Sequence, residues 1–422
     1  MKKLYLFVVI AMFGNIVLAQ DINDVKNLAV LGQNEKAKEA VDKFLLVEKN
    51  AKKAEGWFYK GYIYNQLSKD ATKKPEEASD LKQIAFDALK KYREMDSNAD
   101  LLKDQNNAPL FDIYVGYSSD LGVTAYTNKN VAAAFEGFKK GLEVHDYIVA
   151  NNLTGANGFK FSALDTTLTL YAGITSGELK NTDVSASYYK KLTDANVGDP
   201  QYIDAYQVLA DYYKTKKDHV AFADILAKGR KFYPTNEEYW MALEIEEAID
   251  GVGKPEVFKK YEDLMSRHPA NYTLPYNYSV ELYHYIYSDK AKAGAVAEYK
   301  AKLVEVANKA IVIKSTVDIN FLLANFLYNN SIDVSEEARK LKGPKPDDLK
   351  KKKELEAKAT ATMNESIPYA EAVETLFATL TKPKTSEKIN YKQSLVILKN
   401  IYEVKKDAAK MAAYDKKIKE AE

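Results

Sequence analysis

Apolar side chains recur at intervals of three and four residues along most of the chain, the spacing of one face of an α-helix. The segment between residues 206 and 229 shows this pattern twice, on either side of a short polar stretch. Two amphipathic helices joined by a turn are what such a pattern predicts. The residues that form it are Tyr206, Leu209, Ala210 and Tyr213, then Phe222, Leu226 and Gly229.

The helix-pair pattern repeats with a nearly fixed period. Pro200, Pro234 and Pro269 each follow a helical segment, and they lie 34 and 35 residues apart. Proline cannot continue a helix and disfavours helical geometry in the residue before it, so each proline is expected to end the second helix of a pair. Repeated helix pairs predict a solenoid, because each pair has an apolar face that only its neighbours can bury.

The 34-residue period and the order of large and small residues resemble the tetratricopeptide repeat (TPR) family. The resemblance is tightest over residues 200–285, where a unit beginning at Tyr206 is followed 34 residues later by one beginning at Trp240. It implies an all-α, right-handed α-solenoid of stacked antiparallel helix pairs. Looser copies contain Trp57, Gly61 and Tyr64; Ala85, Leu89 and Tyr92; Leu121, Gly122, Ala134, Phe138 and Gly141; Phe321, Ala324 and Tyr328; and Leu395, Leu398 and Tyr402.

The resemblance also implies a binding surface. In TPR-like proteins the ligand usually lies in a concave groove lined by residues one, two and five places after the first large residue of helix A. Here that rule gives an aromatic and apolar groove with scattered amides, which suits a peptide segment or helix of a partner; the chain's own C-terminal helix is the alternative occupant. The candidate partner-binding residues are Phe58, Tyr59, Tyr62, Asp211, Met241, Asn277, Tyr278, His284, Tyr285, Phe326 and Asn329.

Two sets of aromatic residues are expected to differ in role. Trp57, Tyr206 and Trp240 open helix A of their units and are predicted to lie in the core. The predicted binding anchors are Tyr59, Tyr62, Tyr278 and Tyr285, because the repeat frame points them into the groove and aromatic residues often dominate binding energy.

The first residues have the pattern of a secretory signal. Lys2 and Lys3 precede an apolar run from Leu4 to Leu18, and Ala19 offers a small residue for cleavage, which would leave Gln20 as the N-terminus. The run is about 15 residues, shorter than the ~20 needed to span a bilayer, so a cleaved signal is favoured over an anchor. We expect an exported, periplasmic protein.

The expected organisation has four parts. Residues 1–19 are the signal peptide, residues 20–148 and 162–330 are TPR-like repeats, and residues 331–422 are a C-terminal helical segment with a charged insertion. Three segments are expected to interrupt or extend the repeats. They are a loop at Ser68–Asp80, a loop at Asn151–Phe161, and a helix from Asp347 to Leu380 that begins after Pro346.

The net charge and the absence of cysteine argue against several kinds of partner and chemistry. The chain has 61 basic and 60 acidic residues, and removal of two lysines with the signal leaves a net charge of −1, so bulk charge gives no reason to expect nucleic acid or an anionic membrane as partner. Lys350–Lys353 are interpreted as a solvated helix face, with a membrane- or polyanion-binding patch as the alternative. The absence of cysteine excludes disulfides, thiolate sites and a lipid-modified N-terminal cysteine, so the protein is not expected to be a lipoprotein.

No motif for catalysis, cofactor or metal is recognisable. The four histidines are not at metal-ligand spacing, and Asp250–Gly253 lacks the later glycine of a dinucleotide loop. We therefore expect no cofactor and no enzyme. The leading interpretation is a periplasmic protein-protein interaction scaffold or adaptor in a bacterial envelope assembly or secretion process. The alternative is a glycan- or peptidoglycan-binding repeat protein, since tyrosines lining a groove suit sugar stacking; an enzyme with a cryptic carboxylate site is the least favoured.

Overall fold

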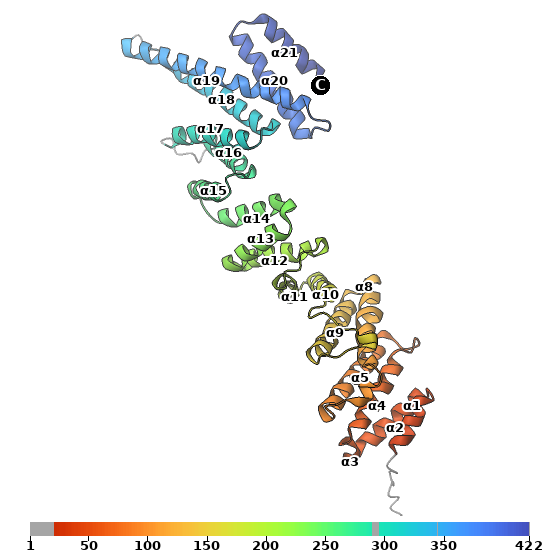
Figure 1. Ribbon diagram of the computed structural model, residues 1–422. Helices are drawn as coiled ribbons and strands as arrows, with labels where there is room; N and C mark the ends of the chain where they lie inside the picture. The colour runs from red at the N-terminus through yellow and green to blue at the C-terminus, as the bar shows by residue number, and fades with distance from the viewer. Residues whose placement is uncertain (1–20, 289–294, 344, 422) are drawn as a thin grey trace, which may run out of the picture. The chain divides into compact units, whose positions relative to one another are not determined.

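The computed structural model describes residues 21–288, 295–343 and 345–421, which belong to two compact units. The first unit ends at Asn236 and the second begins at Glu237. Every regular element in these ranges is a helix (Figure 1), which confirms an all-α solenoid. This boundary falls inside the expected block 162–330. The sequence does not mark it, because the repeat period continues from Pro234 to Pro269. The expected signal peptide, residues 1–19, lies outside the described residues.

Helix pairs joined by short turns build the first unit. Proline and aspartate stand at many of the helix ends. At the end of α13, Phe232 is followed by Tyr233 and then Pro234. At its start, the Asp218 carboxylate accepts a hydrogen bond from the Ala221 N–H. The elements are α1 (Ile22–Val30), α2 (Asn34–Leu46), α3 (Glu48–Ala51), α4 (Ala54–Ser68), α5 (Pro75–Met95), α6 (Asp100–Lys103), α7 (Ala108–Val115), a π-helix (Gly116–Val123), α8 (Thr124–Thr127), α9 (Val131–Ala150), α10 (Thr166–Glu178), α11 (Thr182–Asp194), α12 (Ile203–Lys216) and α13 (His219–Phe232), with short 3-10 turns at Ala156–Gly158, Pro200–Tyr202 and Pro234–Asn236.

The second unit continues the pairing with helices that become longer. Its first three helices have 13 or 14 residues, whereas α18 has 24 and α19 has 33. Pro269 follows the end of α15, so all three prolines of the 34- and 35-residue spacing stand after a second helix, as predicted. The elements are α14 (Glu237–Ile249), α15 (Lys254–Arg267), α16 (Thr273–Ile286), α17 (Val296–Ile313), α18 (Val317–Lys340), α19 (Pro346–Ala378), α20 (Thr385–Val404) and α21 (Ala408–Glu420).

Small residues let paired helices approach closely, as the repeat pattern predicts. A Cβ atom added at Gly61 would lie 2.5 Å from Leu89 Cγ, and one added at Gly137 would lie 2.7 Å from the backbone of Gly122. Gly122 belongs to the π-helix, where the sequence pattern predicts an ordinary helix A. π-helical turns are rare insertions into α-helices. Here both α7 and the π-helix that follows it contact α9.

Two of the three predicted insertions are confirmed and one is wrong. The predicted loop at Ser68–Asp80 is wrong, because α4 continues to Ser68 and α5 already begins at Pro75. Proline in the first turn followed by Glu76 and Glu77 favours a helix start, so the polar composition of this stretch belongs largely to a helix. The loop around residues 151–161 and the long helix starting at Pro346 are present.

Candidate functional site

Five of the predicted partner-binding residues are core residues. Their side chains are at most 7% exposed, so a partner cannot contact them in this structure. The prediction that these five residues line the binding groove is therefore wrong. They are Phe58, Met241, Tyr278, Tyr285 and Phe326. The remaining candidates are half-buried or exposed and stay available for binding: Tyr59, Tyr62, Asp211, Asn277, His284 and Asn329.

The repeat frame is displaced by one residue in α4. Phe58 lies in the core against Tyr92, with ring centroids 5.4 Å apart. Trp57, predicted as a core residue, is only half-buried, and its indole N–H donates to the Ala51 carbonyl over 2.9 Å. Tyr206 and Trp240 are fully buried, as predicted. One residue corresponds to a rotation of about 100° around a helix, which is enough to exchange core and surface.

The two units receive different parts of the candidate set. Tyr59 and Tyr62 pack against Phe58 in the first unit, with ring centroids 5.2 and 6.3 Å away. Asp211 is exposed on α12 of the same unit and lies 3.8 Å from the ammonium of Lys214. Asn277, His284 and Asn329 belong to α16 and α18 of the second unit. The structure brings this last group together on one face.

That face carries two adjoining hollows between the first helices of successive pairs. The hollows have volumes of about 590 and 180 Å³, and both are lined by Tyr276 and Asp318. Asn277 lines the larger and His284 the smaller. The larger is also lined by Glu238, Tyr272, Thr273, Lys314, Ser315, Thr316, Val317, Leu376, Thr379, Leu380, Lys384 and Glu387, and the smaller by Val280, Tyr283, Phe321, Leu322, Asn325 and Asn390. We call this continuous surface the α16–α18 groove.

Amide side chains contribute to the polarity of the smaller hollow, whereas charged groups such as Lys314 and Glu387 line the larger one. Asn325 donates to the Tyr283 hydroxyl over 2.9 Å, and Asn329 donates to the Asn325 carbonyl oxygen over 3.3 Å. The side chains of Asn277 and His284 make no hydrogen bond to another described residue. Groups of this kind can donate to and accept from the backbone of a bound segment. Sequence reasoning found Asn277 and His284 but missed Asn325, which lies one turn before the predicted Asn329.

The C-terminal helix does not occupy this groove. Tyr414 of α21 stacks on Tyr402 of α20, with ring centroids 5.8 Å apart, and the Lys399 ammonium lies 2.6 Å from the Asp415 carboxylate. Lys417 of α21 pairs with Glu374 of α19. No residue of α21 lines either hollow. The alternative in which the chain fills its own groove is therefore wrong for the α16–α18 groove.

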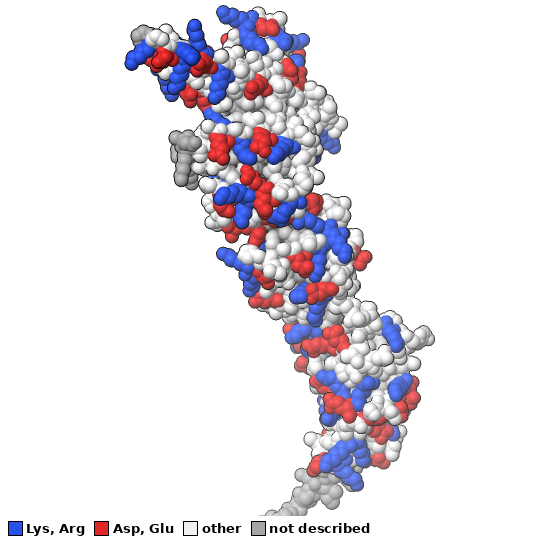
Figure 2. Space-filling view, turned by 60° about the vertical axis from the view of Figure 1, so that its left-hand side comes forward, with Lys and Arg blue, Asp and Glu red and all other residues white. Residues whose placement is uncertain are grey.

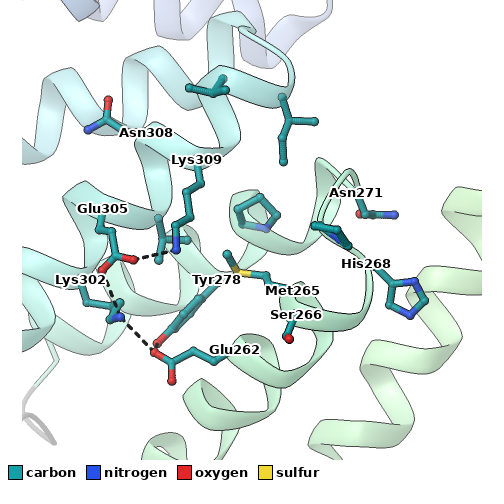
Figure 3. A pocket seen from close by; sticks show the side chains of 15 residues that line it. Glu262, Met265, Ser266, His268, Asn271, Tyr278, Lys302, Glu305, Asn308 and Lys309 are labelled. Carbon is teal, nitrogen blue, oxygen red and sulfur yellow. Dashed lines mark hydrogen bonds and ion pairs between the residues drawn. The ribbon is translucent and has the colours of Figure 1, made fainter.

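A third cavity, of about 830 Å³, lies on the opposite side of α16, between α15 and α17 (Figure 3). Apolar side chains including Met265 and Val306 line it. Its charged groups are already paired with one another: Lys302 lies 3.3 Å from Glu262 and 3.1 Å from Glu305. Hydrogen bonds from Lys309 and Lys302 lower the pKa of the Glu305 carboxyl. A carboxylate held ionised between two ammonium groups is a poor general base, and the link between helices is the ion pair of Lys302 with Glu262.

His145 and His268 have structural surroundings. His145 is 1% exposed, and its ring nitrogens lie 3.0 Å from the Asp146 carboxylate and 3.1 Å from the Ser162 carbonyl. His268 lies 3.3 Å from Glu244. In the described ranges, no three histidine or acidic residues are grouped so that they could hold a metal ion. Over the same residues, no helix combines the length and hydrophobicity needed to cross a membrane.

The stacked helix pairs make the chain a TPR-like helical-repeat protein. No family model matches it and no curated protein is similar to it. Among solved structures it is similar to a TPR repeats protein from Bacteroides fragilis, with 19% identity over 66% of this chain and 96% of that one and a TM-score of 0.30. It is also similar to the TPR domain of P58(IPK), with 11% identity over 90% of this chain and 97% of that one and a TM-score of 0.27.

Proposed function

We propose that the protein is a protein-protein interaction scaffold that binds a segment of a partner in the α16–α18 groove. The observation that carries this proposal is the pair of adjoining hollows, joined through Tyr276 and Asp318, in which the side chains of Asn277 and His284 make no hydrogen bond to a described residue. The smaller hollow is lined by the apolar side chains of Val280, Phe321 and Leu322, and polar groups beside such a surface give orientation and specificity to a bound peptide. The ligand is an extended segment with apolar or aromatic side chains.

The composition of the groove favours a peptide over a glycan. Sugar stacking needs an exposed aromatic face, but the Tyr276 ring is already stacked on Tyr272, with centroids 5.6 Å apart and planes 22° from parallel. Tyr283 likewise contacts Tyr287 and accepts from Asn325. A peptide instead uses the amides and the apolar side chains of Val280 and Leu322 that lie between these rings.

Site-specific photo-crosslinking tests the groove. A photoreactive amino acid at Val280, inside the groove, is expected to link a defined partner in cells, whereas the same residue at Val220, which is 83% exposed on α13, is expected to give none or different products. Asn277→Ala combined with His284→Ala should abolish the Val280 product while leaving the melting temperature unchanged. Identical products from Val280 and Val220, or a product that persists in the double variant, would refute the proposed groove.

We further propose that the protein works outside the cytoplasm, in a bacterial envelope assembly or secretion process. The support is the N-terminal sequence: two lysines, an apolar run of about 15 residues and a small residue at Ala19. Cell fractionation tests it, with the mature chain expected in the envelope fractions and absent from the cytoplasm.

A further inference from the structure

The hairpin formed by α18 and α19 extends beyond the helix pairs on either side of it. The last side-chain links from α18 to α17 are made by Asn330 and Asp333, which contact Lys300 at 2.8 and 3.1 Å. On α19, links to α20 begin at Asn364, which accepts from Lys405 over 2.9 Å. Among the described residues, no hydrogen bond or ion pair joins the hairpin to another helix between these points, and Figure 1 shows the start of α19 reaching past its neighbours. Residues 346–358 alone span roughly 20 Å at 1.5 Å per residue.

The free end of this hairpin concentrates positive charge. Residues 339–353 contain eight basic side chains and two acidic ones, Asp347 and Asp348. The chain reversal places the end of α18 beside the start of α19, so charges that the sequence separates by a turn share one tip (Figure 2). We call it the basic tip; it consists of Arg339, Lys340, Lys342, Lys345 and Lys350–Lys353.

The basic tip differs from the other lysine-rich surfaces of the protein. Elsewhere, lysines on helices are commonly paired with a carboxylate three or four residues away, as Lys190 is with Asp194 at 2.5 Å and Lys309 with Glu305 at 2.7 Å. No ion pair joins a basic-tip residue to any other residue that the structure describes. Positive charges without an internal partner repel one another, and a dense negative surface relieves that repulsion.

An apolar side chain stands among these lysines. Leu349 is 51% exposed, in the turn of α19 just before Lys350. Anionic membrane surfaces attract polybasic segments. There the lysines of the tip would lie beside the charged headgroups, and the leucine would reach the apolar layer beneath them. We propose that the basic tip binds the surface of an anionic phospholipid membrane and thereby holds the scaffold against it. This proposal does not depend on what the α16–α18 groove binds.

Vesicle binding by the full mature chain tests the proposal. The protein is expected to co-sediment with vesicles containing phosphatidylglycerol and not with pure phosphatidylcholine vesicles, and to be released by added salt, because exposed charges are screened. Replacing Lys350–Lys353 with glutamine should reduce the partition coefficient at least tenfold, since each lysine near an anionic surface contributes roughly a fivefold factor. Leu349→Ser should weaken binding less than the lysine replacement does.

A matched variant controls for net charge. Lys49, Lys103, Lys180 and Lys217 are exposed, and replacing these four with glutamine changes the net charge by the same amount. This variant is expected to bind vesicles like the wild type. Equal loss in both variants, undiminished binding by the Lys350–Lys353 variant, or equal binding to phosphatidylcholine would overturn the proposal. So would binding of poly-glutamate through Lys350–Lys353 without vesicle binding, which would assign the tip to an acidic protein.

Discussion

Tyr261 on α15 and Tyr278 on α16 stack face to face, with ring centroids 5.3 Å apart and planes 4° from parallel. Both side chains are at most 3% exposed, and the Tyr278 hydroxyl donates to Glu262 over 3.3 Å. This pair joins the second helix of one repeat to the first helix of the next. Tyr278 is therefore a residue that holds neighbouring repeats together, and the preceding residue, Asn277, is the one that faces the groove.

Tyr278→Ala is expected to destabilise the second unit strongly. Removing a buried aromatic side chain typically costs about 3–5 kcal/mol, because the transfer free energy and the packing around the cavity are both lost. Asn277→Ala should change the melting temperature little, since its side chain is half-buried and makes no hydrogen bond to a described residue. Thermal unfolding of the two single variants checks this; similar melting temperatures would show that Tyr278 is not part of the core.

Gly137→Ala is expected to lower stability although alanine is the better helix former. The added Cβ would meet the backbone of Gly122 at 2.7 Å, and backbone cannot move aside as a side chain can. Overpacking of this kind typically costs ~1–3 kcal/mol, more than the ~1 kcal/mol gained from helix propensity. In the matched variant Gly177→Ala the Cβ meets only the Ser185 hydroxyl, at 3.1 Å, so denaturant unfolding should show unchanged or increased stability.

Alkaline pH is expected to unfold the chain as buried tyrosines ionise. Burial raises the pKa values of Tyr206, Tyr233 and Tyr261 from 10.0 to about 12. Because these phenols ionise more readily in the unfolded chain, their contribution to stability is complete below pH 10 and is lost as pH rises through 12. Tyrosinate absorbance should rise in two phases, the later one together with loss of helical circular dichroism. A single phase at pH 10 with the helices intact would contradict this.

Lys82→Met is expected to stabilise the first unit at neutral pH. Lys82 is 2% exposed and donates to the Ser68 hydroxyl over 3.1 Å, and burial lowers its pKa below 10.5. Replacing a buried charge with an apolar side chain of similar volume often gains about 1 kcal/mol or more. Because the folded pKa is lowered, wild-type stability rises with pH between that value and 10.5, and the advantage of methionine should shrink there.

The control for this prediction is Lys103→Met, at an exposed lysine of the same unit. Its effect on the free energy of unfolding should be small and independent of pH between 8 and 10. A loss of stability in Lys82→Met at neutral pH would instead mean that the hydrogen bond to Ser68 outweighs the cost of burying the ammonium group.

Export should yield a chain that begins at Gln20. Val17 and Ala19 supply the small residues that signal peptidase requires, and the preceding run of about 15 apolar residues is too short to span a bilayer. Intact-mass measurement of the protein from its native host checks the cleavage site. A mass that includes residues 1–19 would show that the segment is retained.

Local features of the sequence determined the helical architecture. The three- and four-residue spacing of apolar side chains and the prolines after α13 and α15 act within a few residues of the chain, so helix pairs and their ends could be predicted. Proline stops a helix whatever surrounds it, because it lacks an N–H and fixes its own backbone angle.

Only the tertiary structure decided which side of each helix faces the core. Trp57 and Phe58 are adjacent and equally suited to burial, and packing against Tyr92 selects Phe58. The burial of Lys82 against Gly116 likewise depends on segments far apart in sequence. A rotation of about 100° per residue makes the exposed face of a helix depend on its neighbours, which its own sequence pattern cannot specify to within one residue.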